Sequence, residues 1–229
     1  RVRTSAPVRE IDQREPGVVH LRGDGFEIEA GHVIVAMHPG DCRSITYQPP
    51  LPAQRSLLQA AWRAGSIFKF HAVYSKPFWR DAGYSGYAYL DLGSIPSVFD
   101  ASPADGSYGV LMIWVMPYFE GAGFGDPAVV YDDPQQRTTA LLGLLAQWFG
   151  PQALEPLAVA EQDWVNDPHT MGCGCATSPG VLTSYGPALR APAGRIHWAS
   201  SETAAHWSGY INGAVESGER AAAEVLAAR

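Results

Sequence analysis

Two short strand-like runs most constrain what this chain can fold into: His32–Met37 (HVIVAM) and Arg195–Ser200 (RIHWAS). The first is a continuous apolar run that follows Gly31 and is stopped by Pro39 and Gly40. A strand that is apolar throughout places apolar side chains on both faces, so it must be buried on both, as in the sheet of an α/β protein. The chain is therefore predicted to have an α/β fold of mixed α+β character.

The segments around these runs alternate between strand and helix patterns. Residues 7–36 have strand-turn-strand composition, which predicts a small antiparallel ribbon. Residues 66–116 hold several strand-like runs separated by Gly, Pro and Asp, which indicates a second, sheet-based domain. Helical patterns cover residues 52–64, 134–149, 151–160 and 211–228.

The C-terminal helical pattern carries two further predictions. Its apolar residues recur at helical spacing and make one face of the helix: Ile211, Ala214, Val215, Ala222, Val225 and Leu226. Glu216 and Arg220 stand four residues apart, a spacing that favours an ion pair on the helix surface.

Charge and hydropathy exclude two classes of partner. The chain has 16 Lys and Arg against 23 Asp and Glu, with no basic block, so we expect no nucleic acid partner. No run of about 18 apolar residues occurs, so we expect no membrane-spanning segment.

The three cysteines are too few, and odd in number, to form a disulfide framework, which favours a reducing, cytoplasmic compartment. His169, Cys173 and Cys175 match no standard zinc spacing, so no metal is expected.

Small residues gather where the last strand-loop-helix begins its helix: Gly209, Gly213, Ala214 and Gly218. They let the backbone approach a flat ligand, and the free N–H groups of a helix start carry partial positive charge. Such a terminus suits an electron-rich ring edge or a phosphate. A glycine-containing core helix would show the same composition.

This stretch closely resembles the C-terminal flavin motif of the flavin monoamine oxidase family. Six further blocks resemble that family in the same order along the chain: APVREIDQ, VIVAMHPG, QPPLPAQR, RAGSIFKFHAVYSKPFWR, EQDWVNDPHTMGC and SPGVLTSYGPALR. The resemblance implies the C-terminal part of a two-domain flavin amine oxidase fold. Residues 1–41 and 164–229 would then belong to an incomplete Rossmann-like FAD-binding domain, and residues 42–163 to a sheet-and-helix substrate-binding domain.

The resemblance also implies which residues hold FAD. Val8 matches the family position whose backbone holds the adenine. Ser201 and Glu202 match positions near the ribityl and pyrophosphate groups. Gly209 lies in the loop against the flavin, and Ile211 matches the position whose backbone N–H faces the pyrimidine edge of the ring.

A second set of residues is implied for the reaction itself. Lys69 matches the family lysine that holds a water against flavin N5, and Trp164 matches the tryptophan packed beside the flavin ring. Tyr210 matches one wall of the aromatic cage that orients a neutral amine, and Trp207 would line the same substrate site. Gly174 stands where the family has the opposite aromatic wall, which implies a wider or differently shaped substrate.

The cofactor and partner follow from the same resemblance. The loop at Cys173, where some family members link FAD through a thioether, is one residue shorter here, so we expect non-covalent FAD. No G-x-G-x-x-G motif follows a strand in this chain. We therefore expect an N-terminal chain or subunit that carries this motif, with the present chain as one piece of a processed or split enzyme. A truncated chain is the competing explanation.

The implied function is FAD-dependent oxidation of a small-molecule amine to an imine, which water hydrolyses, with electrons passed to O2 to give hydrogen peroxide. One alternative is an L-amino-acid oxidase of the same superfamily, which needs an arginine for the substrate carboxylate. Arg63 and Arg80 are the candidates for that arginine. A second alternative is a non-catalytic partner subunit.

Overall fold

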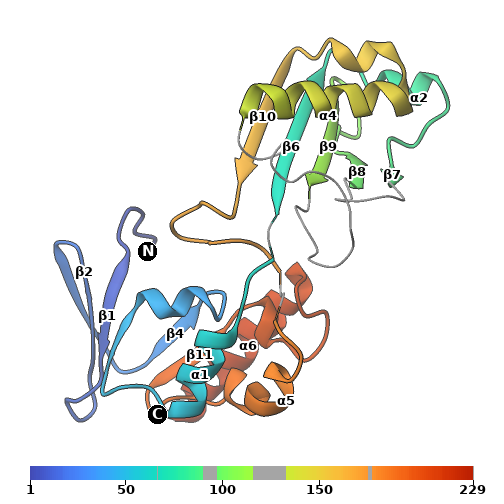
Figure 1. Cartoon of the computed structure of the whole chain (residues 1–229). Coiled ribbons are helices and arrows are strands. Elements are labelled where there is room, and N and C mark those ends of the chain that lie inside the picture. Colours follow the sequence, from blue (N-terminus) through green and yellow to red (C-terminus); the bar gives the residue numbers. More distant parts are fainter. Residues whose placement is uncertain (66, 90–96, 116–132, 175–176, 229) are drawn as a thin grey trace. The chain divides into compact units, whose positions relative to one another are not determined.

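The computed structural model describes residues 1–65, 67–89, 97–115, 133–174 and 177–228 (Figure 1). Parts of the predicted strands, at Ser66, Leu90–Leu92 and Met116, lie outside the described residues, as does Cys175. The chain divides into two compact units. Unit 1 comprises Arg1–Gly65 and Gly174–Arg229, and unit 2 comprises Ser66–Cys173.

The limits of the units, at 65/66 and 173/174, differ from the domain limits predicted at 41/42 and 163/164. Two contacts hold residues 42–65 in unit 1. Strand β5 (Thr46–Gln48) pairs in parallel with β1 (Val8–Asp12), and helix α1 (Ala53–Ala61) packs near α5 (Val181–Tyr185). The assignment of a cofactor or a substrate to either unit stays a prediction.

Unit 1 contains two sheets. The first has the order β3–β2–β1–β5, with β2 at Val19–Gly23 and β3 at Phe26–Ala30. Strands β1, β2 and β3 form the antiparallel ribbon that the sequence predicts. The second sheet is the parallel pair β4 (Val33–Ala36) and β11 (Ile196–Ala199). The predicted mixed α/β fold is confirmed.

Strand β4 is buried on one face only, which corrects the prediction of burial on both. Val33 and Val35 lie in the core of unit 1 with Trp198, whereas Ile34 is 40% exposed. Successive side chains of a strand point to opposite faces, so Ile34 turns away from that core. Within the described residues, β4 is thus covered on one face although it is apolar on both.

Helices complete unit 1. Leu58 and Trp62, on and just after α1, pack with Val181, Ala188 and Leu189 in a second small core. The short helices η1 (Asp41–Ser44), η3 (Gly186–Leu189) and η4 (Ser201–Thr203) join the elements. Helix α6 (Ile211–Ala227) packs on β11. Among the residues that the structure describes, no helix has the length and apolarity to cross a membrane.

The buried face of α6 is made of small residues: Gly213, Ser217 and Ala221. A Cβ atom at Gly213 would stand 2.3 Å from the carbonyl oxygen of Trp207, so the close approach there requires glycine. Most of the predicted apolar face points away from unit 1, and Ile211 is 83% exposed. Because small residues make the contact, the large apolar residues of α6 are left at the surface.

The predicted Glu216–Arg220 ion pair does not form. Glu216 accepts hydrogen bonds from the backbone N–H groups of Ala205 and His206, at 2.8 and 3.0 Å. Arg220 instead pairs with Glu224, one turn further along α6, and donates to the carbonyl of Trp198 at 2.7 Å. Each side chain therefore ties α6 to a segment outside it.

Unit 2 is a five-stranded antiparallel sheet with one face covered by helix (Figure 1). Its order is β10 (Ala158–Asp163), β6 (Phe68–Tyr74), β9 (Gly109–Val115), β8 (Ser97–Asp100) and β7 (Ala88–Tyr89). Helix α4 (Pro134–Phe149) begins at Asp133, whose side chain accepts from the N–H groups of Gln135 and Gln136. The covered face forms a core of alternate strand residues and α4 residues, among them Phe68, Phe70, Ala72, Leu111, Ile113, Leu141 and Leu145.

The helix predicted over residues 151–160 is wrong after its first turn. Helix η2 ends at Leu154, and β10 begins at Ala158. Pro156 lies between them, and pairing with β6 holds the following residues extended. A short helix from Phe78 to Asp81, α2, brings Trp79 into the core of the same unit.

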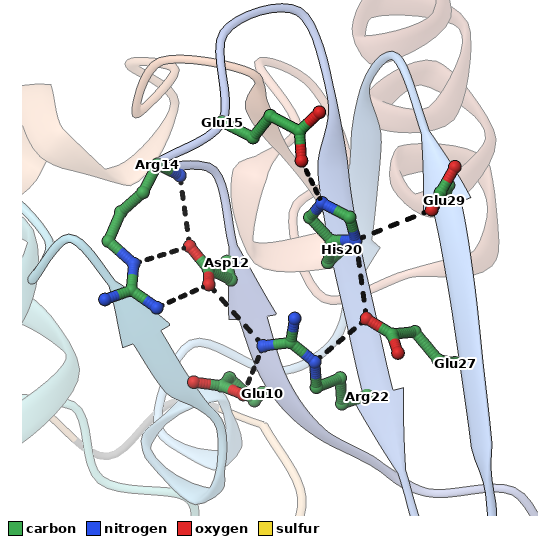
Figure 2. Close-up of polar contacts among 8 residues, drawn as sticks. All are labelled: Glu10, Asp12, Arg14, Glu15, His20, Arg22, Glu27 and Glu29. Atoms are coloured by element: carbon green, nitrogen blue, oxygen red, sulfur yellow. Dashed lines mark hydrogen bonds and ion pairs between the residues drawn. The ribbon is translucent and has the colours of Figure 1, made fainter.

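A polar network covers the exposed side of the ribbon in unit 1 (Figure 2). His20 lies within 2.9 Å of Glu15, 3.4 Å of Glu27 and 4.0 Å of Glu29. Both ring nitrogens thus face carboxylates, and the hydrogen bond to Glu15 is the main reason that the pKa of His20 is raised above its ordinary 6.5. The charged groups beside this cluster are Asp12, Arg14, Glu10 and Arg22, which pair with one another.

We expect the ribbon to lose stability as the pH rises through the raised pKa of His20. Protonated His20 binds the carboxylates more strongly in the folded state than in the unfolded chain, so its stabilisation is present below the ordinary pKa of 6.5 and is lost as the pH rises through the raised pKa. An NMR titration of the His20 ring should give a midpoint above 6.5. His20→Gln should flatten the pH dependence of unfolding over this window. A His20 midpoint at or below the ordinary value would refute this account of the ribbon.

Candidate functional site

Lys69 lies on the face of the unit 2 sheet opposite α4, which no described helix covers and which is termed the open face. Along β6, Phe68 and Phe70 are buried, whereas Lys69 and His71 alternate with them and are half-buried. Lys69 lies opposite Trp114 on β9, and its Nζ is 5.5 Å from the centroid of the Trp114 ring. Among the described residues Lys69 forms no ion pair and no hydrogen bond. A half-buried cation without a carboxylate is thus available to a ligand.

An aromatic row extends from Trp114 across the same open face. The Trp114 ring is 5.5 Å from that of Phe99 on β8, and Phe99 is 5.0 Å from Tyr87. Tyr87 in turn lies 5.0 Å from Tyr89 on β7, in an edge-to-face arrangement. Aromatic rings in such contact present an apolar wall of fixed shape. Among the described residues, this face therefore joins the unpaired cation of Lys69 to an apolar surface.

Trp164 follows the end of β10, two residues beyond Gln162, the cross-strand neighbour of Lys69. Its side chain is half-buried, and its indole N–H is buried without an acceptor among the described residues. The indole N–H of Trp114 is in the same condition. A buried N–H group normally has an acceptor, so each of these two indoles could donate to a polar ligand atom.

His71 shares the open face with Lys69. Burial, assisted by repulsion from the Lys69 charge, lowers the pKa of His71 below its ordinary value. His71 is therefore neutral at physiological pH, and Lys69 carries the positive charge of this part of the face.

The start of α6 forms the second candidate region, in unit 1. The loop from η4 to α6 turns at Trp207 and Gly209, both with positive φ, and the N–H of Gly209 donates to the carbonyl of Ser201. No side chain caps the helix at Tyr210, which leaves backbone N–H donors of the first turn for a ligand. The rings of Trp207 and Tyr210 meet edge to face at 5.9 Å, and Tyr210 is 66% exposed.

The structure brings six of the predicted residues together around this helix start in unit 1: Ser201, Glu202, Trp207, Gly209, Tyr210 and Ile211. Ser201 and Glu202 are half-buried in η4. Ser200, just before them, has a φ of 174°, an extended conformation that serine adopts freely. Val8 is the first residue of β1, and its side chain is half-buried.

Gly174 and Cys173 lie where the chain passes from unit 2 to unit 1. Gly174 has a φ of 70°, and its carbonyl oxygen is 3.1 Å from Nε2 of His38. Cys173 is an exposed free thiol, in contrast to the buried Cys42. Lys69 and Trp164 belong to unit 2.

The sequence did not reveal two residues of these regions. Trp114 was one apolar residue in a predicted strand, and only the β6–β9 register places it opposite Lys69. His38 was part of a Pro-Gly stop signal, and its contact with Gly174 joins residues far apart in the chain. The local sequence did single out Lys69, because a lysine between two phenylalanines in a predicted strand is unusual.

Comparison with known proteins gives a consistent result. The family model for flavin-containing amine oxidoreductases matches residues 1–226. AofH of Mycobacterium tuberculosis, named as a flavin-containing monoamine oxidase, is 41% identical over 228 residues, which are 99% of this chain and 48% of AofH. The flavin-containing amine oxidase B of Homo sapiens is 35% identical over 230 residues, or 99% of this chain and 43% of that protein.

Solved structures agree with these sequences. A redesigned putrescine oxidase has a TM-score of 0.87 at 32% identity, over 98% of this chain and 49% of its own. Cyclohexylamine oxidase from Brevibacterium oxydans IH-35A has a TM-score of 0.85 at 32% identity, over 96% and 48%. The chain thus spans about half the length of the relatives that it matches. On this evidence the chain belongs to the family of flavin-containing amine oxidoreductases.

Proposed function

We propose that the protein to which this chain belongs is an FAD-dependent amine oxidase, in which this chain supplies part of the flavin site and much of the amine site. The observation that carries the proposal is Lys69, a half-buried cation above Trp114 on an aromatic sheet face, for which no described residue provides an ion-pair partner. A scaffold needs no such cation, because an unpaired half-buried charge stabilises nothing by itself.

The start of α6 fits a bound flavin. Its uncapped N–H donors suit the electron-rich edge of the ring, and the glycine at 213 lets the loop at Trp207 pack tightly against the helix. The buried indole N–H of Trp164 offers a further donor to a polar ligand atom. FAD bound there would supply the redox chemistry, namely the removal of a hydride equivalent from the carbon next to the amine nitrogen, with O2 as the proposed electron acceptor and hydrogen peroxide as its product.

The residues of the chain would contribute orientation and electrostatics. Tyr210 and Trp207 present exposed aromatic surface that can orient an uncharged amine. Gly174 presents no side chain, which leaves room for a wide substrate. Lys69 holds positive charge on the open face, where it stabilises negative charge that develops nearby during turnover.

The amino-acid oxidase alternative has less support. It requires an arginine that is free to pair with a substrate carboxylate. Arg80 donates to Asp100 at 2.7 Å, and Asp100 also accepts from Trp79 at 2.9 Å. Arg63 follows α1 and is exposed, whereas Lys69 is held half-buried on a strand. The non-catalytic alternative does not account for Lys69.

A second portion of the protein would complete the flavin site. Apolar residues of α6, and Ile34 on β4, are exposed in the described part of the chain, and a further portion of protein could bury them. The relatives are about twice the length of this chain. We propose that the part that covers them is an N-terminal portion carrying the G-x-G-x-x-G motif, either in the same polypeptide or as a separate subunit.

We expect the complete protein to contain FAD that acid releases. The shortened loop at Cys173 disfavours a thioether bond, although the Cys173 thiol is exposed. After acid precipitation, the flavin absorbance should appear in the supernatant, and mass spectrometry should show this chain unmodified. Flavin that remains attached to the Cys173 peptide would contradict the non-covalent proposal.

Lys69→Met should retain flavin but slow turnover by on the order of 10²-fold, because a preorganised cation beside developing charge is lost. Stopped-flow absorbance should separate reduction by amine from reoxidation by oxygen, and we expect reoxidation to be slowed more. Lys76→Met is the matched control, since Lys76 is exposed and pairs with Asp81. Equal rates in Lys69→Met and the control would remove Lys69 from the mechanism.

Val215→Glu should weaken association with the N-terminal portion, expressed as a separate chain, by more than about tenfold, since an unpaired charge in an apolar interface costs several kcal/mol. Val215 is an exposed apolar residue of α6, and the exposed Glu219 on the same helix gives the control variant Glu219→Gln. Co-purification and flavin content measure the effect. Full association of Val215→Glu would show that another surface is covered.

A further inference from the structure

Two charged side chains bind the backbone of four consecutive residues, 203–206, in the loop before α6. Arg190, which follows η3, donates from Nε and Nη2 to the carbonyl oxygens of residues 203 and 204, at 2.8 and 2.6 Å. Glu216 of α6 accepts from the N–H groups of residues 205 and 206, at 2.8 and 3.0 Å. Each charged group thus makes two hydrogen bonds at once, which fixes both their geometry and the backbone that they bind.

Glu216 holds the loop as a charged group. The hydrogen bond from the N–H of Ala205 is the main reason that the pKa of Glu216 is lowered below its ordinary 4.5, and the bond from the N–H of His206 acts in the same direction. The His206 ring also lies 3.3 Å from Glu216, but its side chain is 82% exposed. The two backbone bonds do not depend on the charge of that ring, so Glu216 retains them at neutral pH.

Trp207, the next residue of the loop, has a strained backbone. Its φ of 52° is unfavourable for a residue with a large side chain, and such a conformation persists only where the surroundings define it. After Trp207, its carbonyl oxygen accepts from the N–H of Tyr210 at 3.0 Å and lies where Gly213 has no Cβ atom. Before Trp207, the described contacts that fix the backbone are those of Arg190 and Glu216.

This backbone determines where two aromatic rings stand. The rings of Trp207 and Tyr210 meet edge to face, with centroids 5.9 Å apart and planes at 88°. Both side chains are exposed in the described part of the chain, so burial among neighbouring residues does not fix them. Their arrangement therefore depends on the backbone from which they extend.

We propose that Glu216 and Arg190 are positioning residues for the amine site: they hold the backbone before Trp207, so that the rings of Trp207 and Tyr210 keep one relative orientation. The role of the two rings rests on the proposed function, whereas the hold on the loop does not. Glu216 and Arg190 act through the loop and need no contact with the amine.

The test compares variants of the complete, flavin-loaded protein. Glu216→Gln keeps one acceptor oxygen but turns an amide donor toward the second N–H group, and Arg190→Lys keeps the charge but loses the planar fork that binds two carbonyls. Glu219→Gln is the matched control, because Glu219 is an exposed residue of the same helix. Hydrogen exchange followed by mass spectrometry reports on two peptides: residues 203–212 for the loop and residues 134–149 for α4.

We expect exchange in the loop peptide to rise about tenfold in Glu216→Gln, because a hydrogen bond to a charged group is lost. Exchange should also rise in Arg190→Lys, although that change removes no bond to an N–H group. The α4 peptide should keep its wild-type rate in both variants, and Glu219→Gln should match the wild type throughout.

The kinetic effect should fall on binding of the amine. With benzylamine and putrescine as probes, both variants should raise KM roughly fivefold, the scale of one misplaced aromatic contact, while kcat changes little. A residue that is needed only for folding would raise exchange in both peptides and leave KM unchanged.

Two results would overturn the inference. Unchanged exchange in the loop peptide of both variants would show that the two side chains do not hold the loop, whether or not the protein oxidises amines. Raised exchange with unchanged KM would show that the position of the loop does not matter to the amine. If the wild-type protein oxidises no amine, the proposed function fails, while the exchange result still decides the hold on the loop. If Glu216→Gln does not fold, Glu216→Asp, shorter by one methylene, takes its place.

Discussion

The pairing of β6 with β9 and β10 is the constraint on which the rest of unit 2 depends. Because side chains alternate between faces, the register that buries Phe68, Phe70 and Ala72 beneath α4 also sends Lys69 to the open face. A shift by one residue would bury the cation in the core and expose the phenylalanines. The hydrophobic core thus fixes the position of Lys69, and the same register sets Trp114 beside it.

Unit 1 is organised by a different constraint, the close approach of α6 to β11. Small residues at 213, 217 and 221 permit it, and the buried His197 strengthens it through a 3.0 Å contact with Glu224. The consequence is that the larger apolar residues of α6 face outward, next to an uncapped helix start. The uncapped helix start, which suits a flavin, and the outward apolar residues of α6, which suit a covering portion, therefore both result from the packing of α6 on β11.

Much of this could be predicted from residues that act locally. The period of the apolar pattern predicted the helices α4 and α6 and the strand β6. Lys69, between two phenylalanines, indicated a face of that strand that differs from the core. What failed depended on contacts between distant segments. Glu216 follows helical spacing to Arg220, yet it bonds the backbone of Ala205 and His206 because the preceding loop folds back onto α6. The observed unit limits differ from the predicted ones for the same reason, because β5 pairs with β1, more than thirty residues earlier in the chain, and this pairing keeps β5 in unit 1.

The central proposal is that the complete protein oxidises an amine by means of flavin. The most direct measurement is an anaerobic titration of the complete flavin-loaded protein with benzylamine and putrescine, followed by flavin absorbance. The account predicts that amine bleaches the oxidised flavin band and that admission of oxygen restores it. A band that amines leave unchanged, but that an L-amino acid bleaches, would contradict the account.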